Sequence, residues 1–253
     1  VIAEKNIRSW LSEFGYKGVE LVLNDWPVCK PVEHENDSEF QAAYVASGVI
    51  SMVENGTVKP VYLGMMDIPA FSKATKENAS FGGGTGLFTR VGLAKPVYNT
   101  YALLSKMQGK IAHVETGDDF VRALASVDDD AIYLLLANFI PSRRIVVHNT
   151  FGIDGGTLSE QDRATFRSRL KDARMNKEQL IKGLLDGSIS VEGLRLPGEV
   201  AKKVTGVIDV ARVAMQRVHQ VAQVNVALTG LKTGGGNWTY EEYVIDKDHA
   251  NSY

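Results

Sequence analysis

The spacing of apolar positions near the start of the chain predicts a helix followed by a buried strand. Apolar side chains recur at helical intervals from Ile7 to Phe14. Residues 19–23 form a short apolar run with β-branched members, which is typical of a strand covered on both faces. The run ends at Asn24 and Asp25, so we expect a carboxylate at the carboxyl end of this strand.

A second helix and a second strand follow along the chain. Small apolar residues repeat at helical spacing over residues 38–53, and Asp37 and Ser38 precede them as capping residues. Residues 58–66 predict a strand, and residues 80–86 a glycine-rich loop. This loop lacks the lysine and hydroxyl residue of a P-loop and the spacing of a dinucleotide fingerprint. Its glycines therefore indicate either a backbone that approaches a ligand closely or a tight turn.

The pattern changes to short strands in the second half of the chain. Apolar runs at residues 120–126, 131–137 and 144–148 are separated by acidic or turn residues, which predicts a β-sandwich. The segment from Val127 to Asp130, with three consecutive aspartates, fits a solvated hairpin turn. A calcium site is the alternative, although the glycine and the terminal glutamate of an EF-hand loop are missing. From residue 221 the apolar residues alternate with polar ones, which predicts a further strand.

Residues 157–220 predict helices instead. Ser159 and Asp162 have the spacing of a capping box, and apolar helical stripes lie on both sides of Pro197. We expect a helical insertion between strands of the sandwich. It could form an oligomerisation or partner surface, or it could be a lid packed on its own domain, which is the commoner outcome.

The composition is that of a globular protein. The chain has 253 residues, 44% hydrophobic and 23% charged, and its formal net charge is -2 at pH 7. This balance points neither to nucleic acid nor to a membrane, and no apolar run approaches the roughly 20 residues of a membrane span. The single cysteine, Cys29, excludes an internal disulfide and a cysteine cluster for a metal. Acceptor triplets at Asn55, Asn78 and Asn237 favour a secreted or extracellular location.

The candidate chemistry lies at the end of the first predicted strand. In a parallel βα barrel the carboxyl ends of the strands form the catalytic face. Asp25 followed by Trp26 places an acid beside an aromatic ring at such an end, which suits sugar chemistry. The alternative is that Asp25 only caps the next segment.

An ordered series of motifs resembles glycoside hydrolase family 39, the group of β-xylosidases and α-L-iduronidase. Asp25 and Trp26 stand where the family has a strand that ends in its nucleophilic glutamate and a tryptophan. The other matches, in chain order, are Asn36-Asp37, the strand-end acid Asp67, the loop residues Phe81, Gly83, Gly84, Gly86 and Leu87, the pair Lys95-Pro96 before a helix over 97–107, and the final segments Tyr243 to Asp246 and His249 to Tyr253. The resemblance covers residues 1 to about 140 and residues 221–253.

The resemblance implies an α/β part followed by an all-β part. Residues 1–110 would be the last strands and helices of a (β/α)8 TIM-type barrel. Residues 111–253 would form a β-sandwich with the helical insertion at about 157–220. Because a complete barrel with an appended domain needs well over 253 residues, we expect the chain to be a fragment. The earlier strands, with the acid/base glutamate of the family, would lie before residue 1.

The resemblance also implies a sugar site. Asp25 takes the position of the nucleophile, and the substrate-binding residues would be Trp26, Asp67, Phe81, Gly83 and Gly84. Trp26 either supports Asp25 or packs beneath it. Asp67 either orients a sugar hydroxyl or binds a neighbouring side chain.

The chain departs from the family at three positions of this site. Asp25 replaces a glutamate, Leu63 a tryptophan and Gly82 a histidine. The xylose or iduronate specificity of the family is therefore not carried over.

Two classes of function follow. The first is a retaining glycoside hydrolase acting on a poly- or oligosaccharide through two carboxyl groups about 5 to 5.5 Å apart. The second is a carbohydrate-binding or structural domain that has lost catalysis. Either way the expected ligand is a carbohydrate, with no cofactor, metal, nucleic acid or membrane, and a homo-oligomer could form through the helical insertion.

Overall fold

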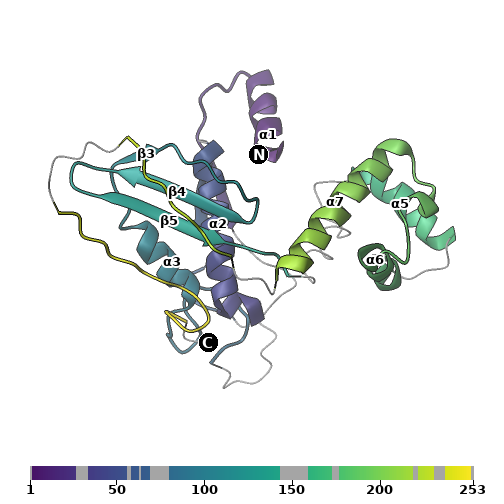
Figure 1. The fold of residues 1–253 in the computed structure, drawn as a ribbon. Helices are drawn as coiled ribbons and strands as arrows, with labels where there is room; N and C mark the ends of the chain where they lie inside the picture. Colours follow the sequence, from purple (N-terminus) through teal and green to yellow (C-terminus); the bar gives the residue numbers. More distant parts are fainter. Residues whose placement is uncertain are drawn as a thin grey trace. The chain divides into compact units, whose positions relative to one another are not determined.

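The computed structural model describes residues 2–26, 34–55, 58–62, 64–68, 80–142, 159–172, 177–218, 222–230 and 237–251. These residues form a mixed α/β chain with two small sheets (Figure 1). The chain divides into two compact units, one comprising Val1–Phe139 with Glu241–Tyr253 and the other Ile140–Tyr240.

The first unit begins with helix α1 (Ile2–Glu13) and a strand-helix-strand arrangement. Strand β1 (Leu21–Trp26) pairs in parallel with β2 (Val58–Tyr62), and helix α2 (Glu39–Asn55) lies between them in the chain. A short 3-10 turn, η1 (His34–Asp37), precedes α2. This crossover is the connection that parallel strands require.

A third segment continues the parallel order beyond β2. Met66 forms a parallel bridge with Phe88, and the Phe88 amide donates to the carbonyl of Met65 over 2.9 Å. Helix α3 (Pro96–Leu104) follows. Three successive chain segments therefore run in one direction side by side, with the glycine-rich loop at the carboxyl end of the second.

The second sheet of this unit is antiparallel and has the order β3-β4-β5, from β3 (Lys110–Ala112), β4 (Val121–Val127) and β5 (Ile132–Asn138). Helix α2 lies against this sheet (Figure 1). The core between them includes Ala46, Ile50, Leu124 and Ala137. The same helix contacts β2. Helix α2 thus joins the parallel and the antiparallel sheet into one unit.

Apolar surface stays exposed on the parallel side of this unit. The exposed fractions are 58% for Trp10 of α1 and 79% for Phe14, which directly follows this helix, although the predicted apolar stripe is present. Val22 of β1 is 53% exposed and Val61 of β2 is 45% exposed. Strands of parallel sheets are normally covered on both faces. The described residues therefore leave both the helix and the strand pair partly uncovered.

The second unit is helical, with α5 (Glu160–Asp172), α6 (Lys177–Asp186), the turn η3 (Glu192–Leu194) and α7 (Gly198–Arg217). The predicted capping box is confirmed, because the Asp162 amide donates to Ser159 Oγ over 3.1 Å and the Ser159 amide to Asp162 Oδ2 over 3.3 Å. Arg212 of α7 donates to the Leu184 carbonyl at the end of α6 over 2.6 Å. The buried apolar residues include Leu180, Leu184, Val204, Ile208 and Ala211.

The mixed α/β class and most predicted elements are confirmed, but one predicted strand is wrong. Residues 222–230 form no strand, and their side chains are exposed. Alternating apolar and polar residues mark a segment that can join a sheet. A strand forms only where a neighbouring strand is available for hydrogen bonding. The predicted strand at 144–148 lies outside the described residues. The barrel remnant, the sandwich, the division at residue 110 and the oligomer formed through the helices stay predictions.

Candidate functional site

Of the predicted site residues, Asp67 and Gly84 come together at Lys95, beyond the carboxyl end of β2. Asp25 and Trp26 end β1, and Asp67 follows β2, so parallel pairing brings both strand ends to one edge. The backbone of Asp25 lies within β1, but its side chain is outside the described part of the structure.

The indole of Trp26 packs against the backbone of α2. A Cβ atom built on Gly48 would lie 2.4 Å from Trp26 Cζ2, so the helix has room for the ring only because residue 48 is glycine. Of the two roles considered for Trp26, packing beneath the strand end is the one this contact supports.

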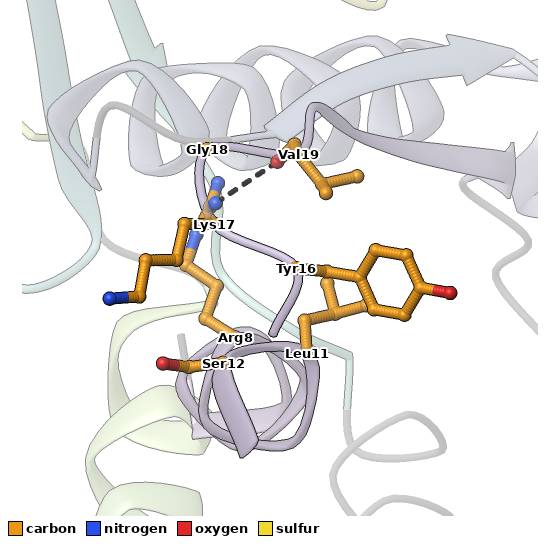
Figure 2. A pocket seen from close by; sticks show the side chains of 7 residues that line it. All are labelled: Arg8, Leu11, Ser12, Tyr16, Lys17, Gly18 and Val19. Atoms are coloured by element: carbon orange, nitrogen blue, oxygen red, sulfur yellow. Dashed lines mark hydrogen bonds between the residues drawn. The ribbon is translucent and has the colours of Figure 1, made fainter. Parts of the chain in front are cut away.

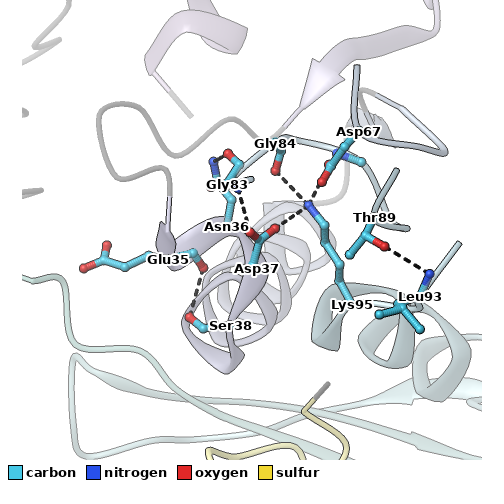
Figure 3. A network of polar contacts seen from close by, with 11 residues as sticks. Glu35, Asn36, Asp37, Ser38, Asp67, Gly83, Gly84, Thr89, Leu93 and Lys95 are labelled. Atoms are coloured by element: carbon cyan, nitrogen blue, oxygen red, sulfur yellow. Dashed lines mark hydrogen bonds and ion pairs between the residues drawn. The ribbon is translucent and has the colours of Figure 1, made fainter. Parts of the chain in front are cut away.

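Lys95 is the centre of a buried charge cluster at this edge (Figure 3). Its ammonium nitrogen Nζ lies 2.6 Å from Asp37 Oδ1 and 2.6 Å from Asp67 Oδ1, and the side chains of all three residues are almost fully buried. Nζ also donates to the Gly84 carbonyl over 3.0 Å. The contacts with Asp67 and Gly84 are hydrogen bonds, and the contact with Asp37 is an ion pair, so three oxygens of the protein surround the ammonium group.

The two carboxylates of the cluster also hold the glycine-rich loop. The Gly83 amide donates to Asp37 Oδ2 over 2.6 Å, and the Gly86 amide to Asp67 Oδ1 over 2.8 Å. Asn36 Nδ2 adds a 3.0 Å bond to the Gly83 carbonyl. The loop is thus fixed through its backbone, by side chains from η1 and from the end of β2.

The glycines of the loop are required by close contact with Asp67. A Cβ atom on Gly84 would lie 2.5 Å from Asp67 Cγ, and one on Gly86 would lie 2.3 Å from the carbonyl carbon of Met66. Gly83 has a φ of 66°, a conformation that L side chains rarely adopt. The sequence indicated that the backbone of this loop approaches a ligand closely or turns tightly. In the structure the loop backbone makes its close contacts with Met66 and Asp67, which follow β2.

The burial of this charge cluster affects the pKa of Asp37 and the balance of charge around Lys95. Burial raises the pKa of Asp37 above the ordinary 3.8, and this effect outweighs the opposing attraction of Lys95. Figure 3 shows the Glu35 carboxylate pointing away from Lys95, so Asp37 and Asp67 supply the compensating charge. With both ionised, the three groups carry a net charge of about -1.

Two tyrosines extend the polar interior beside this cluster. The rings of Tyr62 and Tyr101 lie 5.5 Å apart, and burial raises the pKa of both. For Tyr101 the pKa rises to about 12. Both hydroxyls therefore keep their protons at neutral pH.

The sequence left alternative roles for several site residues, and the contacts in the structure bear on them. Asp67 is 6% exposed and binds a neighbouring side chain, Lys95. Gly83 and Gly84 are buried, Phe81 is half-buried at the start of the loop, and Leu63 lies outside the described residues. The prediction that Asp37 caps α2 is wrong, because its carboxylate binds Lys95 and Gly83, while Ser38 Oγ accepts the Phe40 amide over 3.3 Å.

A small pocket lies away from this site, between α1 and the turn that leads to β1 (Figure 2). It measures about 210 Å³ and is lined by Arg8, Leu11, Ser12, Tyr16, Lys17, Gly18 and Val19. Arg8 Nη1 donates to the Val19 carbonyl over 3.4 Å. None of the predicted site residues lines it.

Within the described ranges, no group of three histidine, cysteine or acidic side chains is placed to hold a metal ion. In the same part of the chain, every helix is too short or too polar to cross a membrane.

Comparison with known proteins gives one structural neighbour of note. No protein family and no curated protein matches the chain. A monomeric β-xylosidase from Caulobacter crescentus CB15 is similar to 51% of this chain and 25% of its own length, with 23% identity and a TM-score of 0.39. The match therefore spans a quarter of that protein, and at this level it assigns no activity to the chain. Membership of family 39 stays a prediction.

Proposed function

We propose that this chain is part of a glycoside hydrolase that cleaves a poly- or oligosaccharide by a retaining, two-carboxylate mechanism. The observation that carries the proposal is the common edge at which β1 ends in Asp25 and Trp26, Asp67 follows β2, and the glycine-rich loop is anchored. Sugar-cleaving carboxylates belong at this edge of a parallel βα arrangement.

In this proposal the residues of the edge have separate tasks. Asp25 attacks the anomeric carbon, and the loop from Phe81 to Gly84 contacts the sugar. Asp37 and Asp67 hold the loop, because both are paired with Lys95 and accept backbone amides. Neither is then available as the proton donor, so the acid/base carboxyl group comes from another residue.

The exposed apolar surfaces support the barrel part of the proposal. Trp10 of α1, Phe14 directly after this helix and Val22 of β1 would be covered by neighbouring βα units in a closed barrel. Unpaired strand edges would be removed by the same closure.

A carbohydrate-binding domain without catalysis is the second candidate. One observation favours it: Asp67 is committed to Lys95 and to the Gly86 amide. The aspartate at position 25 is also one methylene shorter than the glutamate of the resembling family, and a displacement of about 1 Å can cost about 100-fold in rate.

The test is a hydrolysis assay of the full-length protein that contains this chain, on a panel of p-nitrophenyl glycosides, with the variant Asp25→Asn and, as its control, the exposed turn variant Asp129→Asn. We expect at least one glycoside to be cleaved, and the rate to fall by orders of magnitude in Asp25→Asn but not in Asp129→Asn. Sugar binding without hydrolysis in all three proteins would support the binding domain. Hydrolysis that survives Asp25→Asn would remove Asp25 from the mechanism.

A further inference from the structure

Lys95 occupies a position that is unfavourable for a lysine. It is the N-cap residue of α3, directly before Pro96, and its side chain makes no capping hydrogen bond. A cation at a helix N-terminus opposes the helix dipole, and a buried cation loses its hydration. The lysine side chain is nevertheless fully buried. Such a placement requires a compensating interaction, and the structure provides it at Nζ.

Nζ joins three segments that are far apart in the chain. It binds Asp37 in η1, Asp67 after β2 and the carbonyl of Gly84 within the glycine-rich loop. Each bond is between 2.6 and 3.0 Å long. Charge-assisted hydrogen bonds of this kind are stronger than those between neutral groups.

The loop depends on this cluster because it has few side chains of its own. Between Phe81 and Leu87 only Thr85 carries a side chain. The loop is held at Gly83 by Asp37, at Gly84 by Lys95 and at Gly86 by Asp67. Glycine backbone has the largest conformational freedom to lose on ordering, so these bonds decide which conformation the loop adopts.

We propose that Lys95 is a positioning residue that holds the loop from Gly83 to Gly86 at the strand ends in the conformation that binds the sugar. This inference rests on the proposed function. Lys95 itself touches no substrate, since three oxygens of the protein surround its ammonium group. It acts by ordering the loop before the sugar arrives, which removes an ordering cost from binding.

The kinetic consequence is a change in binding rather than in chemistry. A loop that contacts substrate and transition state alike contributes uniform binding, so its loss raises KM and leaves kcat nearly unchanged. We expect KM to rise roughly tenfold when Lys95 is replaced, the order of magnitude that one charge-assisted hydrogen bond contributes.

The experiment uses two variants and one control. Lys95→Met removes the cation but leaves two buried carboxylates, which could prevent folding. The triple variant Lys95→Met, Asp37→Asn, Asp67→Asn removes the charges together and keeps amide oxygens as acceptors for Gly83 and Gly86. Lys59→Met is the control, because Lys59 forms an ion pair with Glu20 in which the side chains are 72% and 61% exposed.

Two readouts are measured on each folded protein: hydrogen exchange of the loop amides, and KM and kcat on the best p-nitrophenyl glycoside. We expect exchange in the loop to be roughly tenfold to hundredfold faster in the triple variant, and this increase to exceed any change of exchange in β4 and β5. KM should rise while kcat is retained. Lys59→Met should match the original chain in both readouts.

Three results would overturn the inference. Loop exchange and KM that stay unchanged in the folded triple variant would show that Lys95 only neutralises the carboxylates. A loss of kcat without a change in KM would place its effect on the chemical step. Unfolding of the whole first unit in both Lys95 variants would make Lys95 a requirement of the fold. If no glycoside is cleaved by the full-length protein, the proposed function fails, while hydrogen exchange still decides whether Lys95 orders the loop.

Discussion

Gly48→Ala tests the contact that fixes the end of β1. In an open helix interior this substitution stabilises by about 1 kcal/mol, because alanine has the higher helix propensity. At Gly48 the new Cβ would lie 2.4 Å from Trp26 Cζ2 and 2.9 Å from Cη2, whereas ordinary contact begins at 3.4 Å. The ring would have to move by about 1 Å, and overpacking of this kind costs about 1–3 kcal/mol. We therefore expect a net destabilisation of about 1 kcal/mol.

Gly206→Ala in α7 is the matched control, since no atom lies within 4 Å of the Cβ position there. It should stabilise the helical unit by about 1 kcal/mol. Urea unfolding followed by circular dichroism and tryptophan emission measures both changes. Trp10 and Trp238 are 58% and 61% exposed, so a shift of emission to shorter wavelength in the folded chain reports mainly on the half-buried Trp26.

A double-mutant cycle isolates the contact between Gly48 and Trp26. Trp26→Leu removes the ring atoms that the new methyl group would meet, so Gly48→Ala should cost nothing further in that background. The reasoning is refuted if Gly48→Ala stabilises the first unit as much as Gly206→Ala stabilises the second. A shift of the Trp26 ring by about 1 Å should also slow any hydrolysis that depends on Asp25, by up to about 100-fold.

Three further predictions concern the charge cluster. Lys95→Met should destabilise the first unit by about 3–5 kcal/mol in urea unfolding, because Asp37 and Asp67 would be left buried without a cation. Because burial raises the pKa of Asp37, the contribution of this residue to stability should fall as the pH rises from 3.8 through the raised value, and Asp37→Asn should flatten that slope; an equal slope in both proteins would contradict it. Gly84→Ala should lower the unfolding midpoint, since its Cβ would lie 2.5 Å from Asp67 Cγ, whereas Gly117→Ala, with open space at that position, should not.

Local patterns in the sequence predicted the individual elements well. The helix expected over 38–53 is α2, the strands expected at 120–126 and 131–137 are β4 and β5, and the capping box forms between Ser159 and Asp162. Each of these rests on residues close together in the chain. Periodicity and capping act over the same short range, so the sequence carries the signal directly.

The charge cluster was not predicted because its members meet only in the folded chain. Asp37 was expected to cap one helix and Lys95 to precede another. Neither of these local patterns indicates that the two side chains meet. Their meeting depends on parallel pairing of β1 with β2, which brings η1, Asp67 and the loop to one edge. A signal was present, since a lysine directly before Pro96 is an unfavourable helix start. The strand expected from residue 221 does not form for a related reason. Alternation of apolar and polar residues does not indicate whether a neighbouring strand is available for pairing.

Covalent trapping tests the central claim most directly. A retaining glycosidase forms a glycosyl-enzyme intermediate, and a 2-deoxy-2-fluoro glycoside of the sugar that is cleaved makes that intermediate long-lived. After incubation of the full-length protein with this reagent and proteolysis, the account predicts that the sugar mass lies on the peptide containing Asp25 and is absent from Asp25→Asn. A sugar adduct on any other residue, or hydrolysis with no adduct at all, would contradict the assignment of Asp25 as the nucleophile at the edge of β1.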